Sequence, residues 1–273
     1  MLARHLFNSG VPVLVVVELR LLFASLLLGA WLLVFRRREL AVPPGHRLRL
    51  LVLAVFGVAT VQASYYTTVA MVGVGLAILL QYLAPALVVL YDRATGRAPL
   101  TRQKLVALGL ATAGTALLVL ADPGGMIRGK PLGIALGLVS ALCYAFYIVF
   151  GKEAVARLPQ LTVNFYSFFV AALVWMVAAP PWRLATAGYS ASQWGWFAAI
   201  AVFSVLVPFG LFYRGLARLE AWRAGLTAML EPVIAALSAW AFLGEGLAPA
   251  QWLGAGLLLG GIAWMQWEER SVG

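Results

Sequence analysis

The sequence predicts an all-α integral membrane protein: an inverted repeat of five-helix units, with nine spans because the first of ten is missing or truncated. Three observations predict this architecture. Hydrophobic residues make up 63% of the 273 residues and charged residues only 11%, whereas soluble domains are about one-quarter charged. The apolar residues form runs of about 20, the length of a helix that crosses a bilayer. The chain also matches itself at an offset of 147 residues.

The apolar runs predict nine membrane-spanning helices with short connections, which leave no room for a soluble domain or a nucleotide-binding cassette. We place the spans near 13–35, 49–70, 74–91, 102–120, 132–151, 162–180, 194–213, 222–243 and 248–266. We therefore expect a multi-pass protein of the cell (inner) membrane, with the lipid bilayer as its surroundings.

The net charge of +10 does not indicate nucleic-acid binding, which needs basic residues gathered on one face or arm. Here the 20 Lys and Arg residues lie in small groups between the apolar runs. When the connections are assigned to alternate sides, 15 of these residues fall on one side, 4 on the other, and Arg20 lies within a span. The richer side, which includes Arg270, is predicted to be cytoplasmic. The C-terminus is then cytoplasmic as well.

The internal repeat has sequence matches that composition alone does not explain. Over residues 77–116, 11 of 40 residues are identical to those 147 positions later, against roughly three or four expected by chance. The matched pairs include Tyr66 with Tyr213, Pro85 with Pro232, Leu100 with Leu247, Gly109 with Gly256 and Gly114 with Gly261.

The span at 132–151 has no counterpart in the first half, so the repeat unit is five spans, and the halves are 1–120 and 121–273. An odd number of spans places the second copy upside-down relative to the first. Inverted repeats are typical of secondary transporters that bind a small molecule at mid-membrane between the halves. The alternative is a two-fold helix bundle that keeps the architecture and transports nothing.

Several sequence motifs resemble one known family. They are LRLLFA at Leu19–Ala24, Leu83-Ala84-Pro85, Glu231-Pro232, and LGEGLAPAQWLG at Leu243–Gly254, ending at Gly261. These motifs resemble the EamA-type transporters of the drug/metabolite transporter superfamily, bacterial ten-span proteins built from two EamA repeats. The resemblance implies a helical bundle with a central cavity, and export or uptake of small metabolites such as amino acids or amphipathic compounds. The family's first helix is absent or truncated here.

Glu231 is the clearest candidate for chemistry, because a carboxyl group at mid-membrane is costly and is usually functional. We expect it to exchange a proton as the protein changes state; the alternative is a packing role beside Pro232. Pro85 and Pro232 each remove a backbone donor in mid-span. Helices broken at equivalent places in both halves are typical of a transporter site, although a kink that only improves packing is the competing interpretation.

Polar side chains at helical spacing are expected to line a wet cavity for a small-molecule substrate. The set is Gln62, Tyr66, Gln81, Tyr82, Pro85, Ser140, Tyr144, Tyr147, Ser204, Thr227 and Glu231. Such groups also bond across packed helices without touching substrate. We expect structural roles for Arg20, as an anchor or a partner for a carboxylate, and for Pro232. Two glycine pairs at a spacing of four allow close helix packing: Gly133 with Gly137, and Gly256 with Gly260.

An enzyme is not expected, since it would need a nucleophile with a base, a carboxylate pair or a metal cluster. No Asp or His lies in mid-span, and Glu18 and Glu231 are the acids within spans. Cys143 has no second cysteine to pair with. We therefore expect neither a metal site nor a cofactor.

Overall fold

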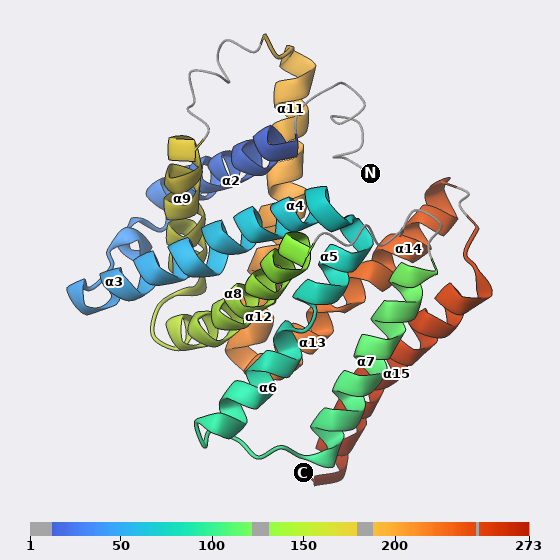
Figure 1. The fold of residues 1–273 in the computed structure, drawn as a ribbon. Helices are drawn as coiled ribbons and strands as arrows, with labels where there is room; N and C mark the ends of the chain where they lie inside the picture. The colour runs from blue at the N-terminus through green and yellow to red at the C-terminus, as the bar shows by residue number, and fades with distance from the viewer. Residues whose placement is uncertain (1–12, 122–130, 179–187, 244–245, 273) are drawn as a thin grey trace. The chain divides into compact units, whose positions relative to one another are not determined.

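The computed structural model describes residues 13–121, 131–178, 188–243 and 246–272. Within these ranges the chain forms helices and no strand (Figure 1). Seven helical stretches in this part of the chain are long and apolar enough to cross a membrane. The all-α membrane fold is thus confirmed, while the count of nine spans stays a prediction.

Each of the nine predicted spans overlaps helical residues, and several are composed of more than one element. The elements are α2 (Val13–Phe35), η1 (Arg37–Leu40), α3 (Pro44–Val52), η2 (Leu53–Ala59), α4 (Thr60–Val72), α5 (Val74–Gln81), α6 (Ala84–Ala94), α7 (Arg102–Leu120), α8 (Pro131–Val155), α9 (Gln160–Ala178), α11 (Ala191–Ile200), η3 (Ala201–Leu206), α12 (Val207–Arg218), α13 (Ala221–Ala228), α14 (Leu230–Leu243) and α15 (Pro249–Val272).

The chain divides into two compact units that do not coincide with the two sequence repeats. Unit 1 contains residues 1–62 and 150–218, and unit 2 contains residues 63–149 and 219–273. Each unit therefore combines part of the first half with part of the second. The boundary between 120 and 121 stays a prediction about the sequence repeat.

In unit 1, helices from the two halves exchange equivalent contacts. Helix α2 packs on η3, and its counterpart α9 packs on η2. Both η2 and η3 are π-helical, and the offset of 147 maps one onto the other. The Thr162 hydroxyl donates to the carbonyl of Glu39 (2.7 Å), which places the start of α9 beside the segment that follows α2. The end of α2 and the start of α9 are therefore neighbours.

In unit 2, α7 and α15 are the counterparts that pack together, and they also run antiparallel (Figure 1). Gln103 near the start of α7 donates to the carbonyl of Met265 near the end of α15 (3.0 Å). Gln251, at the start of α15, donates to the carbonyl of Leu118 at the end of α7 (3.3 Å).

Glycine permits the close approach of these two helices. A Cβ at Gly114 would lie 2.5 Å from the Gly254 carbonyl oxygen, and one at Gly261 would lie 2.8 Å from that of Ala107. The offset of 147 maps Gly114 onto Gly261 and Ala107 onto Gly254, so each of these two contacts is the counterpart of the other. The pair of helices therefore has local two-fold symmetry. A Cβ at Gly256 or Gly260 would meet nothing within 4 Å. The packing predicted for Gly256 and Gly260 is therefore wrong.

Candidate functional site

Two helices of unit 2 are interrupted at equivalent positions. Helix α5 ends at Gln81 and α6 begins at Ala84; α13 ends at Ala228 and α14 begins at Leu230. Pro85 and Pro232 follow the interruptions, and each lacks the N–H that would bond a carbonyl one turn earlier. The breaks predicted from the two prolines are therefore present.

A hydrogen bond joins the two interruptions. The hydroxyl of Tyr82, the residue that closes α5, donates to Oε2 of Glu231 (2.9 Å). The same hydroxyl lies 3.4 Å from the carbonyl oxygen of Ala228, the group whose helical donor Pro232 removes. One phenol thus reaches the carboxylate and the backbone acceptor of the second break.

Glu231 lies in the first turn of α14 and is exposed. A position at mid-span sets the depth of a residue, not the direction of its side chain. A helix N-terminus favours negative charge, so this carboxylate is placed where the backbone stabilises it. Its exposure leaves it accessible to a ligand or a proton.

Tyrosine side chains surround this acid. Tyr144 of α8 interacts electrostatically with Glu231, and its ring stacks on that of Tyr147, with centroids 6.1 Å apart and planes at 17°. Tyr65 of α4 interacts electrostatically with Tyr82. Sequence reasoning missed Tyr65 and selected its neighbour Tyr66, because Tyr66 follows Gln62 by four residues and shares its helix face.

A second polar contact lies one residue before the first break. The side-chain amide of Gln81 donates to the Ser140 hydroxyl (3.1 Å). Ser140 is fully buried and Gln81 is half-buried. This bond ties the end of α5 to α8, the helix that also supplies Tyr144. Unit 2 therefore contains Gln81, Tyr82, Ser140, Tyr144 and Glu231 as a connected set.

Close packing holds the second break in place. A Cβ at Gly225 would lie 3.3 Å from Pro85 Cγ, so glycine lets α13 approach the start of α6. At the start of α13, Glu220 accepts hydrogen bonds from Trp222 Nε1 (2.7 Å) and Arg223 Nε (3.1 Å). Partial burial opposes ionisation of Glu220, but these bonds and the charges of Arg223 and Lys104 outweigh it and lower its pKa.

Three other predicted residues have contacts of their own. Gln62 and Ser204 belong to unit 1, where Gln62 accepts a hydrogen bond from Arg20 (2.8 Å) and Ser204 donates to the carbonyl of Ile200 (2.7 Å). Tyr66 contacts Tyr65 edge-on, with centroids 5.3 Å apart. The partner shown for Arg20 is an amide, and its role as an anchor or a partner for a carboxylate stays a prediction.

Thr227 was expected to share a helix face with Glu231, four residues later. The break at Met229 interrupts that helix, so the spacing does not place the two side chains on one face. The Thr227 hydroxyl donates to the carbonyl of Arg223 (2.8 Å), a bond within its own helix. The helix that was to carry Thr227 and Glu231 on one face is interrupted between them, and a shared role at the site stays a prediction.

The chemistry of the connected set is that of a site for a small polar ligand. Glu231 and the carbonyls near the two breaks accept hydrogen bonds, and the C-terminal ends of α5 and α13 carry partial negative charge. The N-terminal ends of α6 and α14 carry partial positive charge. No group of three or more His, Cys, Asp or Glu within the described residues is arranged to hold a metal ion.

Comparisons with known proteins find one family model, transporter relatives and a solved structure that resemble this chain. The model of the EamA-like transporter family matches residues 1–120 and 131–267. A transporter of Archaeoglobus fulgidus is 32% identical over 96% of this chain and 89% of its own. The threonine/homoserine exporter RhtA of Escherichia coli K12 is 31% identical over 94% of this chain and 83% of its own. A solved crystal structure shares the fold, with a TM-score of 0.80, 20% identity, and coverage of 99% of this chain and 94% of that one.

Proposed function

Because the chain belongs to the EamA-like transporter family, we propose that it is a secondary transporter that moves a small metabolite across the cytoplasmic membrane by alternating access. Its multi-pass helical structure and its transporter relatives establish the general class. The proposal concerns the site, the substrate class and the coupling.

The observation that carries the proposal is the hydrogen bond between Tyr82 and Glu231 at the two helix breaks. Discontinuous helices expose backbone groups that substrates and coupling ions use in secondary transporters. Here the two breaks belong to equivalent positions of the repeat, and a single phenol connects them. A movement that separates the end of α5 from the start of α14 would break this bond.

The substrate class we propose is a zwitterionic amino acid. Its ammonium group would bind to the Glu231 carboxylate and to the carbonyls at the ends of α5 and α13. Its carboxylate would face the N-terminal ends of α6 and α14, as anionic substrate groups do at broken helices. The name of the RhtA relative, a threonine/homoserine exporter, supports this class and makes these two amino acids the first to test.

Glu231 is the group that we propose couples transport to protons. Protonation turns its carboxylate from an acceptor into a donor, which weakens its bonds to a substrate ammonium and to Tyr82. A proton and a substrate would then compete for one carboxylate. That competition drives export when protons enter in exchange.

Alternating access requires two states that the two halves can exchange. The antiparallel packing of the equivalent helices α7 and α15 supports inversion of the second half relative to the first. The two glycine contacts between α7 and α15, which the repeat maps onto each other, also support this inversion.

The test is transport of radiolabelled threonine and homoserine in proteoliposomes, measured as pH-gradient-driven uptake and as counterflow. Glu231→Gln keeps an oxygen that accepts hydrogen bonds but cannot take up a proton. We expect it to lose gradient-driven transport and to retain exchange. Glu39→Gln is the matched control, since Glu39 pairs with the exposed Arg36 (2.8 Å).

Unchanged pH dependence in Glu231→Gln would remove Glu231 from the coupling role. Silence of the wild type in counterflow, with both amino acids and with amphipathic amines, would favour the alternative of a non-transporting membrane protein that keeps the helix bundle.

A further inference from the structure

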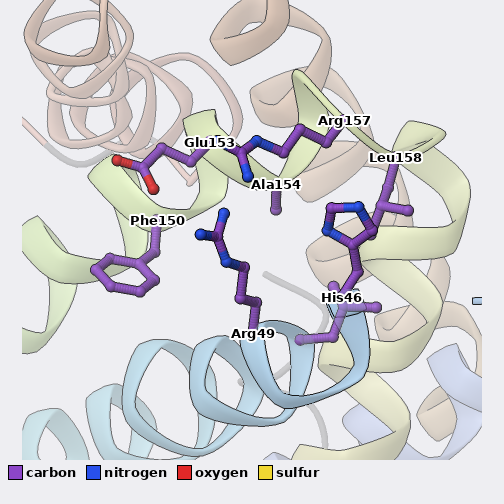
Figure 2. A pocket seen from close by; sticks show the side chains of 8 residues that line it. His46, Arg49, Phe150, Glu153, Ala154, Arg157 and Leu158 are labelled. Carbon is purple, nitrogen blue, oxygen red and sulfur yellow. The ribbon is translucent and has the colours of Figure 1, made fainter. Parts of the chain in front are cut away.

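Unit 1 contains a small hollow between α3 and the end of α8 that takes no part in the proposed transport site. Basic side chains line it: His46 and Arg49 from α3, and Arg157, which follows α8. Figure 2 shows the guanidinium groups of Arg49 and Arg157 both directed into the space between the two segments. Glu153 is the acid of the lining, and its carboxylate points away from the two guanidiniums.

Two guanidinium groups directed into one space repel each other, and water and salt reduce this repulsion without reversing it. An anion between them would reverse it. Arginine matches the oxygens of a phosphate group with paired, charge-assisted hydrogen bonds. The arrangement of Arg49 and Arg157 therefore fits a phosphate group better than a halide or a single carboxylate.

The size of the hollow limits what enters it. Its volume is about 10 Å³, which is close to the space that a single water molecule requires. A phosphate oxygen fits inside while the rest of the ligand stays outside. A complete soluble metabolite does not fit, so the hollow is not a second transport site.

The surroundings of the hollow indicate where the rest of the ligand lies. Leu48 and Leu51, on the same helix as Arg49, are 69% and 47% exposed. Exposed leucines on a membrane-spanning stretch are suited to contact with acyl chains. The charge count also assigns Arg49 and Arg157 to the predicted cytoplasmic side, where anionic lipids attract basic residues near the surface.

We infer that this hollow binds a phosphate group, supplied by the headgroup of an anionic phospholipid in the cytoplasmic leaflet. Arg49 and Arg157 hold the phosphate oxygens from α3 and from the end of α8, while the acyl chains lie along Leu48 and Leu51. The lipid thereby bridges two segments of unit 1 that are far apart in sequence. This inference does not depend on the proposed transport function.

The test is lipid binding to the purified full-length protein, measured by native mass spectrometry with phosphatidylglycerol, phosphatidylcholine or inorganic phosphate. The variant is the double substitution Arg49→Gln, Arg157→Gln. The matched control is Arg47→Gln with Arg218→Gln, which removes the same charge from unit 1. The guanidinium of Arg47 donates to the carbonyl of Val42 (3.2 Å), and neither control residue lines the hollow.

We expect phosphatidylglycerol to bind in preference to phosphatidylcholine, and its affinity to fall about 25-fold in the double variant, or about fivefold for each arginine. The control should lose far less. An equal loss in the control, or no preference for phosphatidylglycerol, would overturn the inference. Binding of inorganic phosphate without phosphatidylglycerol, lost only in Arg49→Gln, Arg157→Gln, would support the phosphate site and overturn the lipid as its source.

Discussion

Glu18 in unit 1 and Glu231 in unit 2 are both acids within predicted spans, but their surroundings are opposite. Glu18 is completely buried in α2, and neither of its carboxyl oxygens accepts a hydrogen bond from the described residues. Glu231 is exposed, lies at a helix break and accepts a hydrogen bond from Tyr82. Both acids lie within apolar runs of the sequence, and this position alone does not distinguish their surroundings.

The difference lies in the helices that carry them. Helix α2 is continuous for 23 residues, so its backbone groups bond to one another and offer nothing to a ligand. The helix that contains Glu231 is interrupted at Met229 and carries Pro232. At an interruption, a ligand can reach unbonded backbone acceptors and a helix terminus as well as the carboxyl group. Within an intact helix, the carboxyl group is the one group that a ligand could bind.

The largest effect that sharpens this comparison is expected from Tyr82→Phe. The substitution keeps the ring and removes the donor to Glu231, a hydrogen bond to a charged group worth roughly 1.5–3 kcal/mol. We expect substrate affinity in counterflow to weaken by about tenfold or more. Tyr91→Phe is the control on the same span, since Tyr91 is exposed at the end of α6. Equal affinity of Tyr82→Phe and the wild type would separate Tyr82 from the site.

A smaller effect is expected from Gly114→Ala, which tests the helix pair that supports unit 2. Its Cβ would lie 2.5 Å from the Gly254 carbonyl oxygen, so the helices must separate, at a cost of about 1–3 kcal/mol. Thermal unfolding in detergent should show a lower Tm. Gly109→Ala on the same helix, where a Cβ meets nothing within 4 Å, should leave Tm unchanged or raise it. Equal loss in both variants would contradict the packing described for α7 and α15.

The smallest effect on transport is expected from Glu18→Leu. A buried carboxyl group without a hydrogen-bond partner costs roughly 1–3 kcal/mol, so leucine should raise the Tm while the pH dependence of transport stays that of the wild type. Glu18→Gln keeps a buried polar group and should give no gain in Tm. Loss of pH-gradient-driven transport in either variant would transfer the coupling role from Glu231 to Glu18.

Much of the fold follows from local sequence. Apolar runs predict the helices because backbone groups in a bilayer must bond within the segment. Pro85 and Pro232 predict the breaks, because proline removes a donor wherever it stands in a helix. The match of Gly114 with Gly261 also marks the close approach of α7 and α15, which the pair Gly256 and Gly260 does not.

The connections between segments could not be predicted. Tyr82 and Glu231 are 149 positions apart, and no local pattern indicates that the end of α5 and the start of α14 bring them together. Hydropathy gives the depth of Glu231 and not its exposure. The spacing of Thr227 and Glu231 assumes a continuous helix, which the turn at Met229 interrupts. Tyr65 and Tyr66 are adjacent, so spacing could not decide which of them lies near Tyr82.

The central claim is that Glu231 exchanges a proton for a substrate. Its most direct test is the number of protons that the purified protein releases on addition of threonine or homoserine in weakly buffered detergent solution, followed with a pH-sensitive dye. We predict release by the wild type and by Glu18→Gln, and none by Glu231→Gln although that variant still binds the amino acid. Undiminished release by Glu231→Gln would contradict the claim.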